Sequence, residues 1–215
     1  MRWSYLVAAL AALPTPTLAH DAFGDLGPFY ANLLHPMADP MQAALGLGTA
    51  AFLAGRSLNT VRLALPVFVA SAALSYLVLG WRFGVTAAPI MASAAAIAVG
   101  AAAMLPERWT PVAAALVLVT GTGAFVGLSP DQPMPSDLAQ AILGTLLGIA
   151  AFILIAWAMF DATARHVSRL APAIVGSWVA AVGLLAGAFS FQIETADAIG
   201  VSTSRDGLSV QGADQ

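Results

Sequence analysis

Several residues whose side chains could bind a metal ion precede or begin the first long apolar segment of the sequence. Imidazole nitrogens suit nickel, copper and zinc, whereas methionine sulfur favours Cu(I). If His20 became the N-terminus of a processed chain, its α-amino group and its imidazole could hold the same ion. The candidate metal ligands are His20, His35, Met37, Asp39 and Met41.

The same residues also have a structural interpretation. Asp39 is a good N-cap, Pro40 suits the first helical position, and Gln42 falls where its side chain could return to the Asp39 backbone in a capping box. The sequence has no HxxxH or HExxH spacing. Helix capping therefore explains Asp39 without a metal, and both interpretations stay open.

The composition predicts an integral membrane protein. Hydrophobic residues make up 60% of the 215 residues and charged residues only 9%, a balance typical of membrane helices. The absence of cysteine excludes disulfides, thiolate metal sites and cysteine nucleophiles. A net charge of -3 without a basic patch gives no surface for nucleic acid. No nucleophile–base pair, carboxylate pair or cofactor motif is found, so catalysis is not expected.

Three parts of the chain are predicted. Residues 1–19 resemble a secretory signal peptide cut after Ala19, the alternative being a retained first helix. Residues 20–192 are expected to form an all-α membrane bundle of about six transmembrane helices, and residues 193–215 a polar, disordered tail. The six apolar segments cover 40–55, 61–80, 85–105, 111–128, 138–160 and 170–191.

The distribution of charge predicts the orientation in the inner (plasma) membrane. Most arginines fall in the first, third and fifth loops, whereas most acidic residues fall in the other connections and the tail. The positive-inside rule then places the odd loops in the cytoplasm and both mature termini outside. Among the arginines of the loops, Arg82 is the one that does not follow this rule.

Small residues predict close packing between the helices. Three pairs of glycines have the GxxxG spacing that lets helix backbones approach each other. Packing within the chain is the favoured interpretation, and oligomerisation is the alternative. The pairs are Gly123 and Gly127, Gly144 and Gly148, and Gly183 and Gly187.

The chain resembles the HupE/UreJ family of hydrogenase and urease accessory membrane proteins. The resemblance is sharpest from His20 to Arg56, where an Ala-His pair, the run Leu33-Leu34-His35-Pro36 and a Gly- and Ala-rich segment follow one another. The family's first-span pattern is His, five residues, then Asp-His. His35 matches its first histidine, but Met41 and Gln42 occupy the Asp-His positions. The family's later histidine motif keeps only Phe125 and Gly127 here.

The resemblance implies a membrane protein that transports or delivers a metal ion, which is nickel in the family. The two methionines of the candidate site favour a softer ion such as Cu(I). The expected partners are the lipid bilayer, the metal ion and an accessory protein or metalloenzyme. The alternative is a non-transporting accessory or scaffold protein that assists assembly of a metalloenzyme or membrane complex. Only His35 can be carried over as a family ligand.

Overall fold

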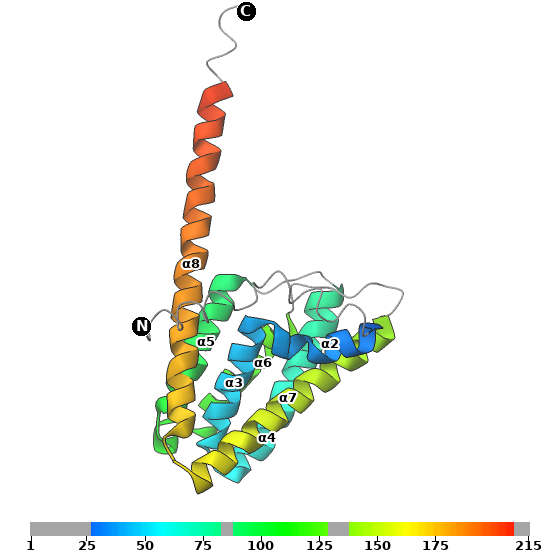
Figure 1. The fold of residues 1–215 in the computed structure, drawn as a ribbon, viewed down its shortest axis with the longest axis vertical. Helices are drawn as coiled ribbons and strands as arrows, with labels where there is room; N and C mark the ends of the chain where they lie inside the picture. The colour runs from blue at the N-terminus through cyan, green and yellow to red at the C-terminus, as the bar shows by residue number, and fades with distance from the viewer. Residues whose placement is uncertain (1–26, 83–87, 129–137, 209–215) are drawn as a thin grey trace, which may run out of the picture.

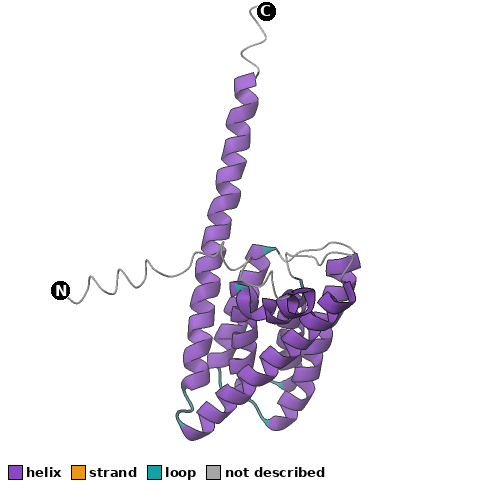
Figure 2. Ribbon diagram, turned by 45° about the vertical axis from the view of Figure 1, so that its right-hand side comes forward, coloured by secondary structure: helices purple, strands orange, loops and turns teal. Residues whose placement is uncertain are grey.

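The computed structural model describes residues 27–82, 88–128 and 138–208, and all elements within these ranges are helical (Figures 1 and 2). The predicted signal peptide and His20 lie outside the described residues. The elements are α2 (Gly27–Ala38), α3 (Pro40–Ala54), α4 (Leu58–Leu74), the π-helix η3 (Ser75–Arg82), α5 (Pro89–Met104), the 3-10 turn η4 (Glu107–Trp109), α6 (Val112–Gly127), α7 (Leu138–His166) and α8 (Ala171–Leu208).

The helices confirm that the protein is all-α and suited to a membrane. Of the six predicted spans, only some are confirmed by helix length and composition. Three helices are long and apolar enough to cross a bilayer: Leu58–Gly80, Ala139–His166 and Ala171–Gln192. The apolar helices α3, α5 and α6 have only 15 or 16 residues. At about 1.5 Å per residue they are about 22–24 Å long, short of a hydrocarbon core of about 30 Å.

Helix α3 lies at the centre of the bundle and packs against α5, α6, α7 and α8. It is apolar on all sides, and Leu45, Phe52 and Leu53 are fully buried. A helix surrounded by other helices needs no polar face, which explains why its sequence shows no amphipathic pattern. Its N-terminal end adjoins α2, and its C-terminal end leads into the connection to α4.

The glycine pairs confirm packing within the chain. Gly123 and Gly127 on α6 face the backbone of α4, Gly144 and Gly148 on α7 face α2, and Gly183 on α8 faces α5. At Gly123 an added Cβ atom would lie 2.6 Å from the carbonyl oxygen of Phe68. These helices thus come into backbone contact where the missing side chains leave room.

Helix α2 was not anticipated from the sequence. It lies across one end of the bundle, at a steep angle to α3 (Figures 1 and 2), and its main neighbour is α7. Because its 12 residues are few and include Pro36, the sequence reads as a connecting loop. The helix instead carries His35 and Met37.

Helix α8 is longer than the segment predicted for it. Its apolar part ends at Gln192, and the backbone remains helical through Leu208, projecting beyond the rest of the bundle (Figure 1). A disordered tail was predicted from residue 193, and the structure differs from this prediction over 193–208. Extending an existing helix costs much less than starting one, because nucleation has already taken place.

Candidate functional site

The junction of α2 and α3 carries most of the predicted metal ligands. The Asp39 N–H donates to the His35 carbonyl oxygen over 2.9 Å, so one turn of helical hydrogen bonding links the two residues. Asp39 itself has an extended backbone, and its carboxylate Oδ1 accepts the Gln42 N–H over 2.7 Å. The structure therefore confirms the predicted N-cap and places Asp39 one turn after His35.

The predicted capping box is only half formed. Its second half required the Gln42 side chain to accept the Asp39 N–H, but the His35 carbonyl already accepts that proton because α2 runs directly into α3. Gln42 is 5% exposed, and its buried Oε1 has no hydrogen-bond partner among the described residues. An unpaired amide oxygen thus lies at the start of the central helix.

The other predicted ligands are distributed unevenly. His35 is half-buried and Met37 is exposed, whereas Met41 packs against the hydrophobic core. Within the described ranges, no three His, Cys, Asp or Glu side chains come together as a metal site. A metal ion bound here would need amide or thioether donors beside His35 and Asp39.

Helix α2 is held firmly against α7. Thr145 donates from Oγ1 to the Asn32 side chain over 3.3 Å, and the Asn32 amide donates to the Pro28 carbonyl over 2.8 Å. Pro36 is fully buried. Gly148 leaves room for the carbonyl group of Leu33. These contacts fix the helix that carries His35.

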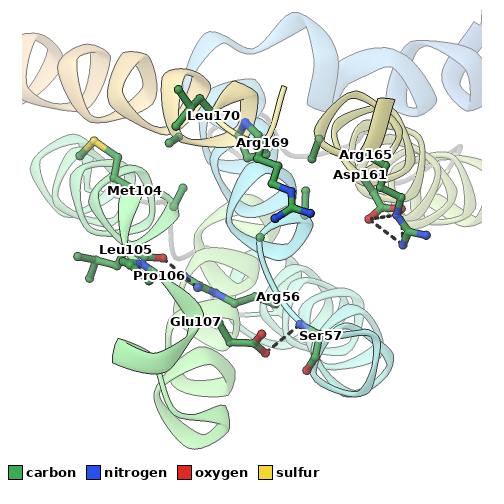
Figure 3. Close-up of a pocket in the computed structure, with 16 residues that line it drawn as sticks. Arg56, Ser57, Met104, Leu105, Pro106, Glu107, Asp161, Arg165, Arg169 and Leu170 are labelled. Carbon is green, nitrogen blue, oxygen red and sulfur yellow. Dashed lines mark hydrogen bonds and ion pairs between the residues drawn. The ribbon is translucent and has the colours of Figure 1, made fainter. Parts of the chain in front are cut away.

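A cavity of about 640 Å³ lies at the opposite end of α3 (Figure 3). Its walls come from the α3–α4 connection, the end of α5 with η4, the last turns of α7 and the start of α8. Three arginines and two carboxylates line it, although they are far apart in the sequence. These residues are Arg56, Glu107, Asp161, Arg165 and Arg169.

Arg56 is the buried member of this group. Its two terminal nitrogens donate to the carbonyl oxygens of Leu105 and Ala102 over 3.0 and 2.8 Å, which closes the C-terminal end of α5. The guanidinium carbon lies 4.3 Å from the centre of the Phe52 ring, a cation–π contact. Burial lowers the pKa of Arg56, and nearby Glu107 partly offsets that effect.

Three of the other charged side chains of the cavity have hydrogen-bond or ion-pair partners, and the fourth has none among the described residues. Glu107 accepts the Ser57 N–H over 2.9 Å, and this hydrogen bond holds the pKa of its carboxyl below the usual 4.5. Asp161 pairs with Arg165 over 2.9 Å. Arg169 makes no hydrogen bond or ion pair with another described residue, and its side chain reaches into the cavity in Figure 3.

Comparison with protein families, characterised proteins and solved structures finds no match for this chain.

Two features of these sites were not predicted from the sequence. Gln42 was predicted as a cap residue and was not among the candidate ligands, although it occupies a histidine position of the HupE/UreJ pattern, and that correspondence was the available signal. The arginine cavity was missed because its residues come from separate loops. The signal for it was the predicted location of Arg56, Arg165 and Arg169 on the same side of the membrane.

Proposed function

We propose that the protein is a six-helix inner-membrane protein of the HupE/UreJ type that admits or delivers a metal ion at the outer end of α3. In this proposal the short helices α3, α5 and α6 also cross the membrane, with the bilayer thinned around them. Both mature termini lie outside, and the metal ion is the substrate. His35, Asp39 and Gln42 form the entry site, with Met37 at its exposed edge.

The unpaired Gln42 Oε1 is the observation that carries the proposal. A buried polar group without a partner costs about 1–3 kcal/mol, so such groups are rare and need an explanation. Here the oxygen is close in sequence to an imidazole and a carboxylate, at the outer end of the central helix. An amide oxygen can bind a cation, which would satisfy it. His20, with its terminal amine after processing, would complete the donor set.

Metal binding and uptake in two matched histidine variants test this proposal. His35→Ala should lower calorimetric affinity for nickel, copper, cobalt or zinc by at least about tenfold, equivalent to losing about 1.4 kcal/mol of binding. His166→Ala removes an exposed histidine at the other end of α7 and should change nothing. Whole-cell metal content should follow the same order.

Gln42→Leu separates a ligand from a structural residue. If Gln42 binds the ion, the variant should lose affinity yet unfold at a higher temperature, because an unpaired buried oxygen has been replaced by an apolar group. Asp39→Asn is the companion variant, since asparagine keeps the N-cap and removes the charge. It should weaken metal binding without lowering stability.

If these metal-binding experiments fail, the accessory or scaffold function becomes the favoured alternative. If His35→Ala, Gln42→Leu and Asp39→Asn all bind and accumulate the four metals as the wild type does, the metal proposal is refuted. The same result would follow if the wild type bound none of them. The fold would then serve assembly of a metalloenzyme or membrane complex.

A further inference from the structure

We propose that the cavity between the ends of α3, α5 and α7 and the start of α8 binds the phosphate of an anionic phospholipid headgroup. The cavity, about 640 Å³, lies within the range of about 300–1,000 Å³ that is usual for small-molecule sites. The site is independent of the metal entry site, which lies at the other end of α3.

The charges of the cavity leave a positive surplus. Three arginines and two carboxylates line it, giving 3 - 2 = +1. Asp161 forms an ion pair with Arg165, and Glu107 accepts the Ser57 N–H and opposes the charge of Arg56. Arg169 therefore has no counter-charge of its own within the described part of the chain, and Arg56 lies below it in the wall of the cavity (Figure 3). Guanidinium groups match phosphate oxygens in shape and charge.

Arg56 adds a buried donor to this surplus. The residue is only 9% exposed, and its Nε has no hydrogen-bond partner among the described residues. A buried N–H on a cationic group without an acceptor is costly. Nearby Glu107 opposes the charge of Arg56 without accepting from Nε, and an anionic oxygen in the cavity would supply that acceptor. The positive end of the α8 dipole, at Ala171, favours an anion at the same place.

The position of the cavity favours a lipid over a soluble anion. It adjoins the end of α7 and the start of α8, two helices that can cross a bilayer, so it lies at the level of the headgroups. Met104, Leu105 and Leu170 line it as well and are 47%, 46% and 68% exposed. Exposed apolar side chains beside a basic pocket suit an acyl chain next to a phosphate.

Native mass spectrometry of the full-length protein tests this inference. The protein is reconstituted with phosphatidylcholine alone or with added phosphatidylglycerol, and retained lipid is counted. Arg169→Gln should reduce phosphatidylglycerol retention at least about tenfold, because it removes a charge-assisted hydrogen bond. Arg108→Gln makes the same charge change at an exposed arginine outside the cavity and should have no effect. Asp161→Asn releases Arg165 and should increase retention.

Three results would overturn the inference. The first is equal loss of phosphatidylglycerol in Arg169→Gln and Arg108→Gln, which would indicate only general surface attraction. The second is retention in Asp161→Asn no higher than in the wild type. The third is stabilisation of the lipid-free, detergent-solubilised protein by inorganic phosphate, dependent on Arg169 and as strong as that by phosphatidylglycerol, since a soluble phosphate would then be the ligand.

Discussion

Substituting alanine for Gly100 should separate two helices that now touch through their backbones. An added Cβ at Gly100 would lie 2.5 Å from the Gly176 carbonyl oxygen and 2.6 Å from the Ala180 nitrogen. Both neighbours are backbone atoms of α8, so no side-chain rotation can relieve the clash. Helix α5 and helix α8 must move apart, and the contact between them is the most extensive in the bundle.

Gly121→Ala and Gly187→Ala calibrate the magnitude. Gly121 has nothing within 4 Å of its added Cβ, and Gly187 has only the Ser93 side chain at 3.3 Å. All three replacements gain about the same helix propensity, at most about 1 kcal/mol, so this gain cancels between them. The difference between Gly100→Ala and Gly121→Ala is then the overpacking cost alone, about 1–3 kcal/mol.

Thermal unfolding in detergent, followed by circular dichroism, measures this difference. At about 2–4 °C per kcal/mol for a chain of this size, Gly100→Ala should unfold well below Gly121→Ala, with Gly187→Ala between them. Equal midpoints for all three variants would refute the reasoning, because they would mean that α5 and α8 do not touch at Gly100.

Three further predictions concern the two ends of the bundle. Asp39→Ala should lower the free energy of unfolding by about 1 kcal/mol, whereas Asp39→Asn should leave it nearly unchanged, as chemical denaturation will show. Since the pKa of Glu107 lies below 4.5, its stabilising contribution is present above that pH and is lost as the pH falls through the lowered pKa. The difference in melting temperature between wild type and Glu107→Gln should therefore shrink in acid, and a constant difference would contradict it. Alkaline phosphatase fused after Gln215 should be active, and a cytoplasmic reporter at the same site inactive, if the C-terminus lies outside.

Hydrophobic patterning predicted the main helices well, because long apolar segments have few alternatives to a helix in a membrane. The predicted segment 111–128 corresponds to α6 (Val112–Gly127), and 40–55 corresponds to α3. The lengths of the helices did not follow from the pattern, since apolar character and helix length are separate properties. The predicted segment 170–191 illustrates this, because its helix continues through Leu208.

Tertiary contacts limited the prediction of both sites. Helix α2 is stable because Gly144 and Gly148 leave room for its backbone on α7, and this pairing joins residues more than a hundred positions apart. The Asp39 cap could be predicted because it depends on neighbours in the sequence. The unpaired Gln42 side chain could not be predicted in this way. Its expected donor, the Asp39 N–H, is already bonded to the His35 carbonyl oxygen of α2.

The two ends of α3 differ in charge, and this difference makes transport and delivery distinguishable. The N-terminal end has an imidazole, a carboxylate and an amide oxygen, all suited to a cation, whereas Arg56 follows the C-terminal end directly. A metal ion moving along α3 would meet the repulsion of this arginine in a region shielded from water, where charge interactions are strong. An anionic headgroup in the adjoining cavity would cancel part of that repulsion.

Phosphatidylglycerol in the vesicle membrane should therefore speed metal uptake if the ion crosses. If the ion is only delivered at the N-terminal end of α3 and does not cross, the metal content of the vesicle interior should not respond to phosphatidylglycerol. Arg169→Gln should abolish the acceleration, and an acceleration that persists in that variant would show that the lipid acts elsewhere.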